Sequence, residues 1–270
     1  MVVQHNMAAS NANRQLGIST NVLSKSTEKL SSGYRINRAA DDAAGLSISE
    51  KMRSQIRGLN KASSNAQDGI SAIQTAEGAL NEAHSILQRM NELATQAAND
   101  TNTTTDRKAV QSEIDALTKE ISRIASTTQF NTQNLLDGKF TGKNLQVGAL
   151  NGQSISISIK TMNADALSVN ALHVTSFKAA GSAMNKIQAA IDKVSTQRSN
   201  LGALQNRLEH TVNNLDNVAE NTQTAESRIR DTDMASEMVQ YSATSIIQQA
   251  GQSMLAQANS QTQGVLSLIQ

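Results

Sequence analysis

Residues 59–94 read LNKASSNAQDGISAIQTAEGALNEAHSILQRMNELA, and an apolar or alanine side chain returns at every seventh position of this stretch. The positions that share this spacing are Leu59, Ala66, Ile73, Leu80, Leu87 and Ala94. A seven-residue repeat of this kind marks the face of a long helix that packs against other helices. The stretch therefore predicts a fold built on association between helices.

The composition argues against several classes of protein. The 270 residues include no Pro, Cys or Trp, two Tyr and three Phe, too few for the aromatic-rich core of a typical enzyme. A formal net charge of +1 and the scarcity of aromatic rings disfavour nucleic-acid binding. No stretch approaches the roughly 20 apolar residues that span a bilayer, and residues 1–11 do not resemble a cleaved signal peptide. We expect no nucleic-acid partner and no membrane insertion, and any export must proceed without a cleaved signal.

Three helices are expected before the middle of the chain. In the first, leucines seven residues apart form a narrow apolar stripe on a polar helix. The second, roughly residues 43–98, would be about 80 Å long at about 1.5 Å per residue. It would end at residues 99–105, a run of Asn, Asp and Thr whose side chains compete for backbone hydrogen bonds. A third helix is expected through residues 110–124, where apolar residues return at four-three spacing.

The periodicity changes between residues 129 and 178. Ile155, Ile157 and Ile159 alternate with polar residues, which predicts a short half-buried strand, and nearby glycines predict the turns of one or two hairpins. Helical spacing returns near Ala183 and continues to Ile229. Six successive heptads in this region indicate a coiled coil or a long bundle.

The last segment is almost uncharged, since Glu237 is its only ionisable side chain from Met234 to Gln270. Its apolar residues cover too wide an arc for a helix surrounded by water. The expected partners are the thin stripe at the beginning of the chain and, beyond that, copies of the same chain. We therefore expect both ends to be mobile in the monomer and to become ordered only on assembly.

Seven motifs occur in order along nearly the whole chain: residues 30–37 (LSSGYRIN), 41–45 (DDAAG), 65–69 (NAQDG), 77–82 (EGALNE), 128–131 (TQFN), 201–207 (LGALQNR) and 265–270 (VLSLIQ). Together these motifs resemble bacterial flagellin. The resemblance implies a structural subunit of the extracellular flagellar filament. Such a subunit is exported unfolded through the flagellar secretion channel and polymerises at the tip.

The resemblance and the periodicity together predict a mainly α fold. We expect a long antiparallel helical bundle or coiled coil with a small β-hairpin region at about residues 129–178. The terminal segments, residues 1–43 and 233–270, would pair as a second coiled-coil layer, and residues 44–232 would form the bundle. Only about fifty residues separate the third helix from the fourth, so we expect no variable outer domain.

Filament assembly is assigned to apolar residues of the two terminal segments. These are Leu16, Leu23, Leu30, Met254, Leu255, Leu266, Leu268 and Ile269. The resemblance further implies self-association, an export chaperone on the C-terminal segment, and contacts with flagellar cap and hook-junction proteins.

A second surface is expected on the long helix. Arg89 lies about 200° around the helix from Leu87, and we expect Leu93 to be exposed beside it. In flagellins, the stretch similar to residues 88–96 and an acidic position, here Glu113, are recognised by the vertebrate Toll-like receptor that senses flagellin. The resemblance thus implies receptor binding by Gln88, Arg89, Leu93 and Glu113. The alternative is that Arg89 and Glu113 form an ordinary solvated helix face.

Catalysis is the competing class of function, and the motifs do not favour it. His5, His84, His173 and His210 stand far apart, without the H-E-x-x-H spacing of a zinc protease. A nucleophile elbow and a phosphate-binding glycine loop are also missing from the sequence. We therefore expect neither an enzyme nor a metal or cofactor. The periodicity alone would also fit a helical type III secretion translocator or a capping protein.

Overall fold

The computed structural model describes residues 6–267, except the side chains of residues 262, 263 and 265–267. Contacts divide the chain into two units, Gln55–Glu220 and a terminal unit of residues up to Ser54 with residues from Asn221. These divisions fall inside two long helices, whereas the sequence placed its boundaries at 43/44 and 232/233. Among the described residues, each helix is either too short or too polar to span a membrane.

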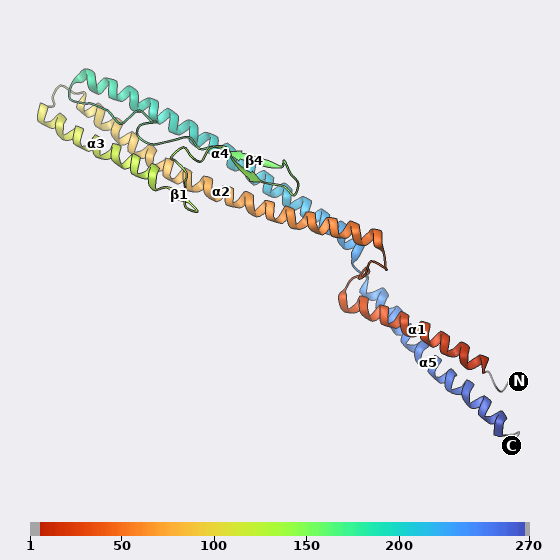
Figure 1. The fold of residues 1–270 in the computed structure, drawn as a ribbon. Helices are drawn as coiled ribbons and strands as arrows, with labels where there is room; N and C mark the ends of the chain where they lie inside the picture. The colour runs from red at the N-terminus through yellow and green to blue at the C-terminus, as the bar shows by residue number, and fades with distance from the viewer. Residues whose placement is uncertain (1–5, 268–270) are drawn as a thin grey trace. The chain divides into compact units, whose positions relative to one another are not determined.

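Three helices lie side by side in the unit Gln55–Glu220: α2 (Ala43–Ala97), α3 (Thr104–Thr127) and α4 (Phe177–Arg230) (Figure 1). The six residues of the seven-residue repeat in α2 are all buried, and they face buried residues of α4 such as Ile187 and Leu201 in a largely aliphatic core. This arrangement confirms the predicted mainly α fold with long helices.

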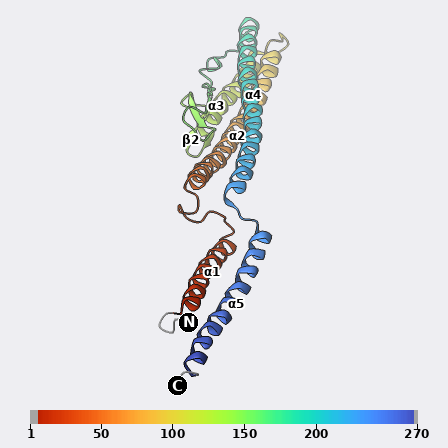
Figure 2. The ribbon, with the colours of Figure 1, turned by 90° about the vertical axis from the view of Figure 1, so that its right-hand side faces the viewer.

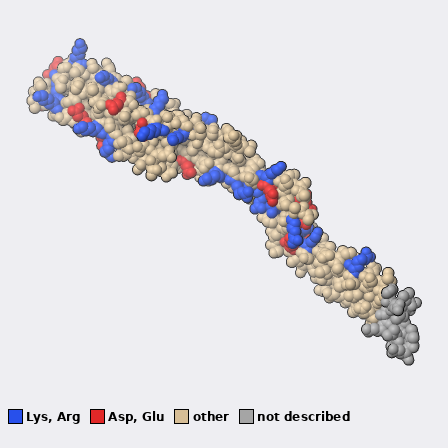
Figure 3. Space-filling view, viewed as in Figure 1, with Lys and Arg blue, Asp and Glu red and all other residues tan. Residues whose placement is uncertain are grey.

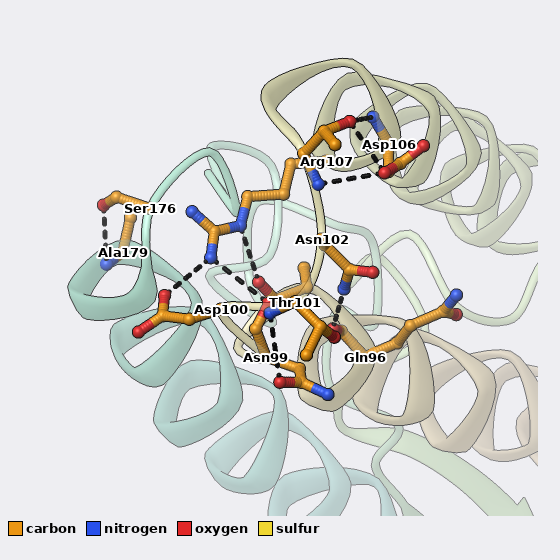
Figure 4. A network of polar contacts seen from close by, with 11 residues as sticks. Gln96, Asn99, Asp100, Thr101, Asn102, Asp106, Arg107, Ser176 and Ala179 are labelled. Atoms are coloured by element: carbon orange, nitrogen blue, oxygen red, sulfur yellow. Dashed lines mark hydrogen bonds and ion pairs between the residues drawn. The ribbon is translucent and has the colours of Figure 1, made fainter.

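Arg107 joins the end of α2 to the beginning of α3 (Figure 4). Its Nε donates to the Ala97 carbonyl at 3.1 Å, and one terminal nitrogen donates to the Asn99 carbonyl at 3.3 Å and to Asp100 Oδ1 at 2.9 Å. The guanidinium thereby satisfies the Ala97 carbonyl, which the end of α2 leaves without an intrahelical partner. The polar run after residue 98 thus ends the helix as predicted.

Thr103 and Asp106 form a capping box at the start of α3. Thr103 donates from its backbone N–H and its hydroxyl to Asp106 Oδ2, at 2.9 and 2.7 Å, and these bonds lower the pKa of Asp106 below its ordinary value. Because the folded carboxyl has the lower pKa, its stabilisation is complete above the ordinary carboxyl pKa. It is lost as the pH falls from there through the folded value.

Thr103→Ala is expected to raise the pKa of Asp106 toward its ordinary value, because the hydroxyl is the largest cause of the shift. An NMR titration of the Asp106 carboxyl in the wild type and in Thr103→Ala measures this change directly. Thr103→Ser keeps the hydroxyl and serves as the control, with a titration close to that of the wild type. An unchanged Asp106 pKa in Thr103→Ala would contradict this assignment.

Two short antiparallel hairpins lie between α3 and α4. Strand β1 (Gln129–Phe130) pairs with β2 (Gln133–Asn134), and β3 (Lys143–Gln146) pairs with β4 (Ser154–Ile157). Figure 2 shows these segments on one side of the long helices. Ile155 and Ile157 of β4 are buried, and so is Ile159 just after the strand. The predicted β-hairpin region is confirmed.

The β1–β2 turn carries two non-glycine residues in left-handed backbone conformation, Asn131 at φ 46° and Thr132 at φ 63°. Asn tolerates this region, whereas a β-branched residue is strained there. Thr132→Gly is therefore expected to stabilise the fold by about 1 kcal/mol, the released strain exceeding the entropic cost of glycine.

Thermal unfolding tests this expectation, with a rise in Tm of about 2–4 °C for a chain of this size. Asn131→Gly is the matched variant in the same turn and should change Tm much less. A lower Tm for Thr132→Gly than for the wild type would refute the strain at this residue.

The terminal unit contains α1 (Met7–Ser32) and α5 (Met234–Ser267), which lie side by side in both ribbon views (Figures 1 and 2). Helix α1 ends at Gly33, whose φ of 74° and N–H bond to the Lys29 carbonyl form a left-handed cap. After this cap, Tyr34 forms an antiparallel bridge with Asp231. The predicted pairing of the terminal segments is thus present, while their mobility in the monomer and the domain boundaries remain predictions.

Candidate functional site

The face of α1 that meets α5 has few large apolar side chains. Leu16, Leu23 and Leu30 are half-buried there, and Ser19 and Ser26, which stand between them, are buried. Buried hydroxyls contribute little apolar area, so α1 alone offers a weak hydrophobic surface.

The facing side of α5 is more polar still. Glu237 and Thr244 are buried, and Tyr241, Gln248 and Leu255 are half-buried at the same four-three spacing. Lys29 Nζ of α1 lies 3.5 Å from Glu237 Oε2. The two helices are antiparallel, since the Asn6 side-chain amide at the start of α1 donates to the Ala258 carbonyl near the end of α5. Their inner seam is therefore largely polar.

Apart from Tyr241 and Leu255, most of the large apolar residues that the structure describes on α5 lie away from this seam. The exposed fractions are 71% for Val239, 66% for Ile246, 54% for Ile247 and 65% for Met254, and these four residues are called the outer stripe below. Steps of seven or eight residues place them on one side of the helix. Met234 and Met238, also about half exposed, lie on the opposite flank. In Figure 3, much of the terminal-unit surface on the drawn face is tan.

The structure divides the predicted assembly residues into two groups. The leucines of α1 and Leu255 belong to the seam within one chain, whereas Met254 points outward. Leu268, Ile269 and the Leu266 side chain lie outside the described residues. The prediction did not include Val239 and Ile246, although their seven-residue spacing was a usable signal.

The second predicted surface joins α2 to α3. Arg89 Nε and one terminal nitrogen donate to Glu113 Oε1 at 3.1 and 3.0 Å, and the other terminal nitrogen donates to Glu92 Oε2 at 3.2 Å. These bonds, with Glu113 contributing most, raise the pKa of Arg89 above its ordinary value. All three side chains remain about half exposed or more, so the bridge can be reached by a partner.

Leu93 is not exposed beside Arg89, and the prediction was wrong on this point. Its exposed fraction is 2%, and it belongs to the same core as Ile114 and Ile121 of α3. The heptad pattern suggested a single buried seam on α2, whereas α3 covers a second side of the helix. Gln88 is exposed, with its amide nitrogen 3.1 Å from His84 Nε2.

Within residues 6–267, no group of three or more His, Asp or Glu side chains is placed to hold a metal ion. The outstanding feature of the described chain is α5, a helix with a single acidic side chain, buried in the seam, and with apolar side chains exposed on two flanks. Such faces are typical of helical proteins that assemble through their helices. The fold and this surface therefore place the chain in the class of helical proteins that assemble through their helices.

The chain belongs to the bacterial flagellin family. Residues 3–141 match the bacterial flagellin N-terminal helical region, and residues 184–269 match the C-terminal helical region. A flagellin of Halalkalibacterium halodurans is 56% identical over 271 residues, with both chains covered in full. A flagellin of Bacillus subtilis is 51% identical over 304 residues, again with full coverage of both.

Solved structures agree with this assignment. The crystal structure of Bacillus cereus flagellin is 33% identical and has a TM-score of 0.50, covering 56% of this chain and 88% of that one. A putative flagellar hook-associated protein from Vibrio parahaemolyticus shares the fold at 13% identity, with a TM-score of 0.60, covering 71% of this chain and 100% of that one. The protein is therefore a structural subunit of the extracellular flagellar filament that polymerises with copies of itself, and it is not an enzyme.

Proposed function

We propose that the subunit polymerises through its terminal helices and that neighbouring copies cover the outer stripe of α5. The observation that carries this proposal is the exposure of Val239, Ile246, Ile247 and Met254 on a helix with one acidic or basic side chain among its described residues. Helix α1 cannot cover them, because its contact with α5 is on another side. An apolar surface on both flanks of a helix is stable only when it is buried.

The same surface would need protection before assembly. An export chaperone that covers α5 would keep its apolar flanks out of water in the cytoplasm, and no cleaved signal would be needed. Cap and hook-junction proteins would contact the same terminal helices at the two ends of the filament.

Purified protein at high ammonium sulfate concentration tests polymerisation directly, because this salt strengthens the burial of apolar surface. Electron microscopy and sedimentation are expected to show filaments. Filaments formed equally well by a chain with charged residues on the outer stripe would overturn the proposed role of α5.

We also propose that the vertebrate Toll-like receptor for flagellin recognises the surface of Gln88, Arg89 and Glu113. Support comes from the exposure of these side chains and from the Arg89–Glu113 bridge, which presents them together across α2 and α3. Leu93 would contribute from beneath, because its packing holds α2 and α3 in place.

Arg89→Ala is expected to weaken receptor binding by about tenfold or more, since an arginine in the centre of an interface often contributes most of the affinity. Surface plasmon resonance with the receptor ectodomain measures this change. Arg123→Ala is the matched control, because Arg123 forms a similar exposed bridge with Glu120 on α3. Equal affinities of the wild type and Arg89→Ala would mean that the bridge is an ordinary solvated face.

A further inference from the structure

The methionines of this chain divide sharply by exposure. The sequence contains nine, and the structure describes all except Met1. Met90 and Met162 are buried, and Met52 and Met184 are half-buried. The four exposed methionines all belong to α1 or α5: Met7, 75%; Met234, 47%; Met238, 50%; and Met254, 65%. Exposed thioethers are thus concentrated on the helices that the proposed function assigns to assembly.

A peroxide oxidises such a thioether in a simple balanced reaction. The sulfur attacks one oxygen of hydrogen peroxide, the O–O bond breaks, and methionine sulfoxide and one water are formed. Sulfur loses two electrons, and the peroxide gains them. Exposed methionines react before buried ones, and methionine sulfoxide reductases reverse the reaction. Met90 and Met162 are therefore protected by the fold in which they are buried.

The product changes the character of the assembly surface. A thioether is a flexible apolar group, whereas a sulfoxide is polar and accepts hydrogen bonds. Glu237, the single acidic or basic residue of α5 in the described part, lies in the inner seam, so the outer flanks carry no charge of their own. A sulfoxide on these flanks loses its water when a neighbour covers it, and each hydrogen bond to water that the neighbour does not replace weakens the contact.

We propose that Met7, Met234, Met238 and Met254 are reversible oxidation sites, and that oxidation of their sulfurs blocks the addition of further subunits. The inference rests on the proposed function, in which the subunit polymerises through these terminal helices. What it adds is that peroxide inhibits assembly, and that this inhibition is caused by oxidation of the four exposed sulfurs and not of the buried methionines.

Full-length protein treated with hydrogen peroxide, then quenched, tests the proposal. We expect sulfoxide at the four positions by mass spectrometry and a rise of at least about tenfold in the concentration needed for polymerisation, which is about 1.4 kcal/mol. Methionine sulfoxide reductases should restore assembly. Normal polymerisation of protein oxidised at these four residues, or a loss that the reductases do not reverse after the sulfoxides are gone, would overturn the proposal.

Two variants locate the response. A chain with all four exposed methionines replaced by Leu should lose its sensitivity to peroxide when compared with its own untreated sample, so any change in its basal assembly cancels. Met90→Leu with Met162→Leu should keep the full sensitivity. If the four-leucine variant remains sensitive to peroxide, or if Met90→Leu with Met162→Leu loses this sensitivity, the four exposed methionines are not the cause and the proposal is overturned.

The charged variant Ile246→Asp separates this proposal from the one on which it depends. If Ile246→Asp polymerises normally, the outer stripe is not an assembly surface and the proposed function fails. If Ile246→Asp is blocked while peroxide has no effect on the wild type, only the oxidation site fails.

Discussion

Ile246→Asp is expected to abolish filament growth while leaving the monomer folded. The side chain is 66% exposed, so the single chain loses little by the change. In a filament, the substitution removes about 1.5–3 kcal/mol of apolar burial. It also takes a carboxylate out of water, which costs several kcal/mol more. At about 1.4 kcal/mol per tenfold change, the concentration needed for polymerisation should rise by at least about a hundredfold.

Sedimentation at increasing protein concentration measures this effect, and circular dichroism checks that the helices of the monomer are retained. Ile246→Leu is the matched control, because it keeps the volume and the apolar character and should retain assembly. Filaments of Ile246→Asp at the wild-type concentration would show that neighbours do not cover this part of α5.

Leu93→Ala is expected to destabilise the unit Gln55–Glu220 by about 2–5 kcal/mol, the usual cost of truncating a fully buried leucine. Leu93 is 2% exposed and lies in one core with Met90, Ile114 and Ile121. The cavity would open in the core that α2 shares with α3. Chemical denaturation followed by circular dichroism gives the loss as a lower midpoint.

This result changes how receptor measurements on Leu93 are interpreted. Weaker binding by Leu93→Ala would reflect a shifted α3 and a displaced Glu113, so it would not identify a contact. Leu93→Met nearly conserves the volume and should keep both stability and receptor affinity. If Leu93→Ala unfolds at the wild-type midpoint, Leu93 does not support the α2–α3 pair.

The sequence predicted most of the bundle because its signals were local. The heptads from Leu59 to Ala94 marked a buried face of α2, the Asn and Thr run after residue 98 marked its end, and the alternating isoleucines marked β4. The exposure of Leu93 was predicted wrongly because the buried fraction of a helix depends on how many other helices pack against it. The sequence pattern of α2 alone does not show how many helices do so.

The terminal helices also show that a sequence pattern does not identify the neighbour of each helix face. The sequence of α5 showed apolar residues over a wide arc, and it favoured burial of that arc against the N-terminal stripe. In the structure, the side of α5 that faces α1 carries Glu237, Thr244 and Gln248 as well as Leu255, and most of the larger apolar residues stay outside. The Lys29–Glu237 ion pair and the hydrogen bond from Gln248 to Thr20 help to set which side of α5 faces α1. A hydrophobicity pattern does not reveal such polar contacts.

The exposed apolar groups on both flanks of α5 have a consequence for the time course of growth. A first encounter between two subunits covers one flank at most, so a pair gains little apolar burial and separates quickly. A subunit that joins an existing end finds neighbours for both flanks and dissociates slowly. Nucleation is then the slow event, so spontaneous polymerisation should begin after a lag that shortens steeply with protein concentration.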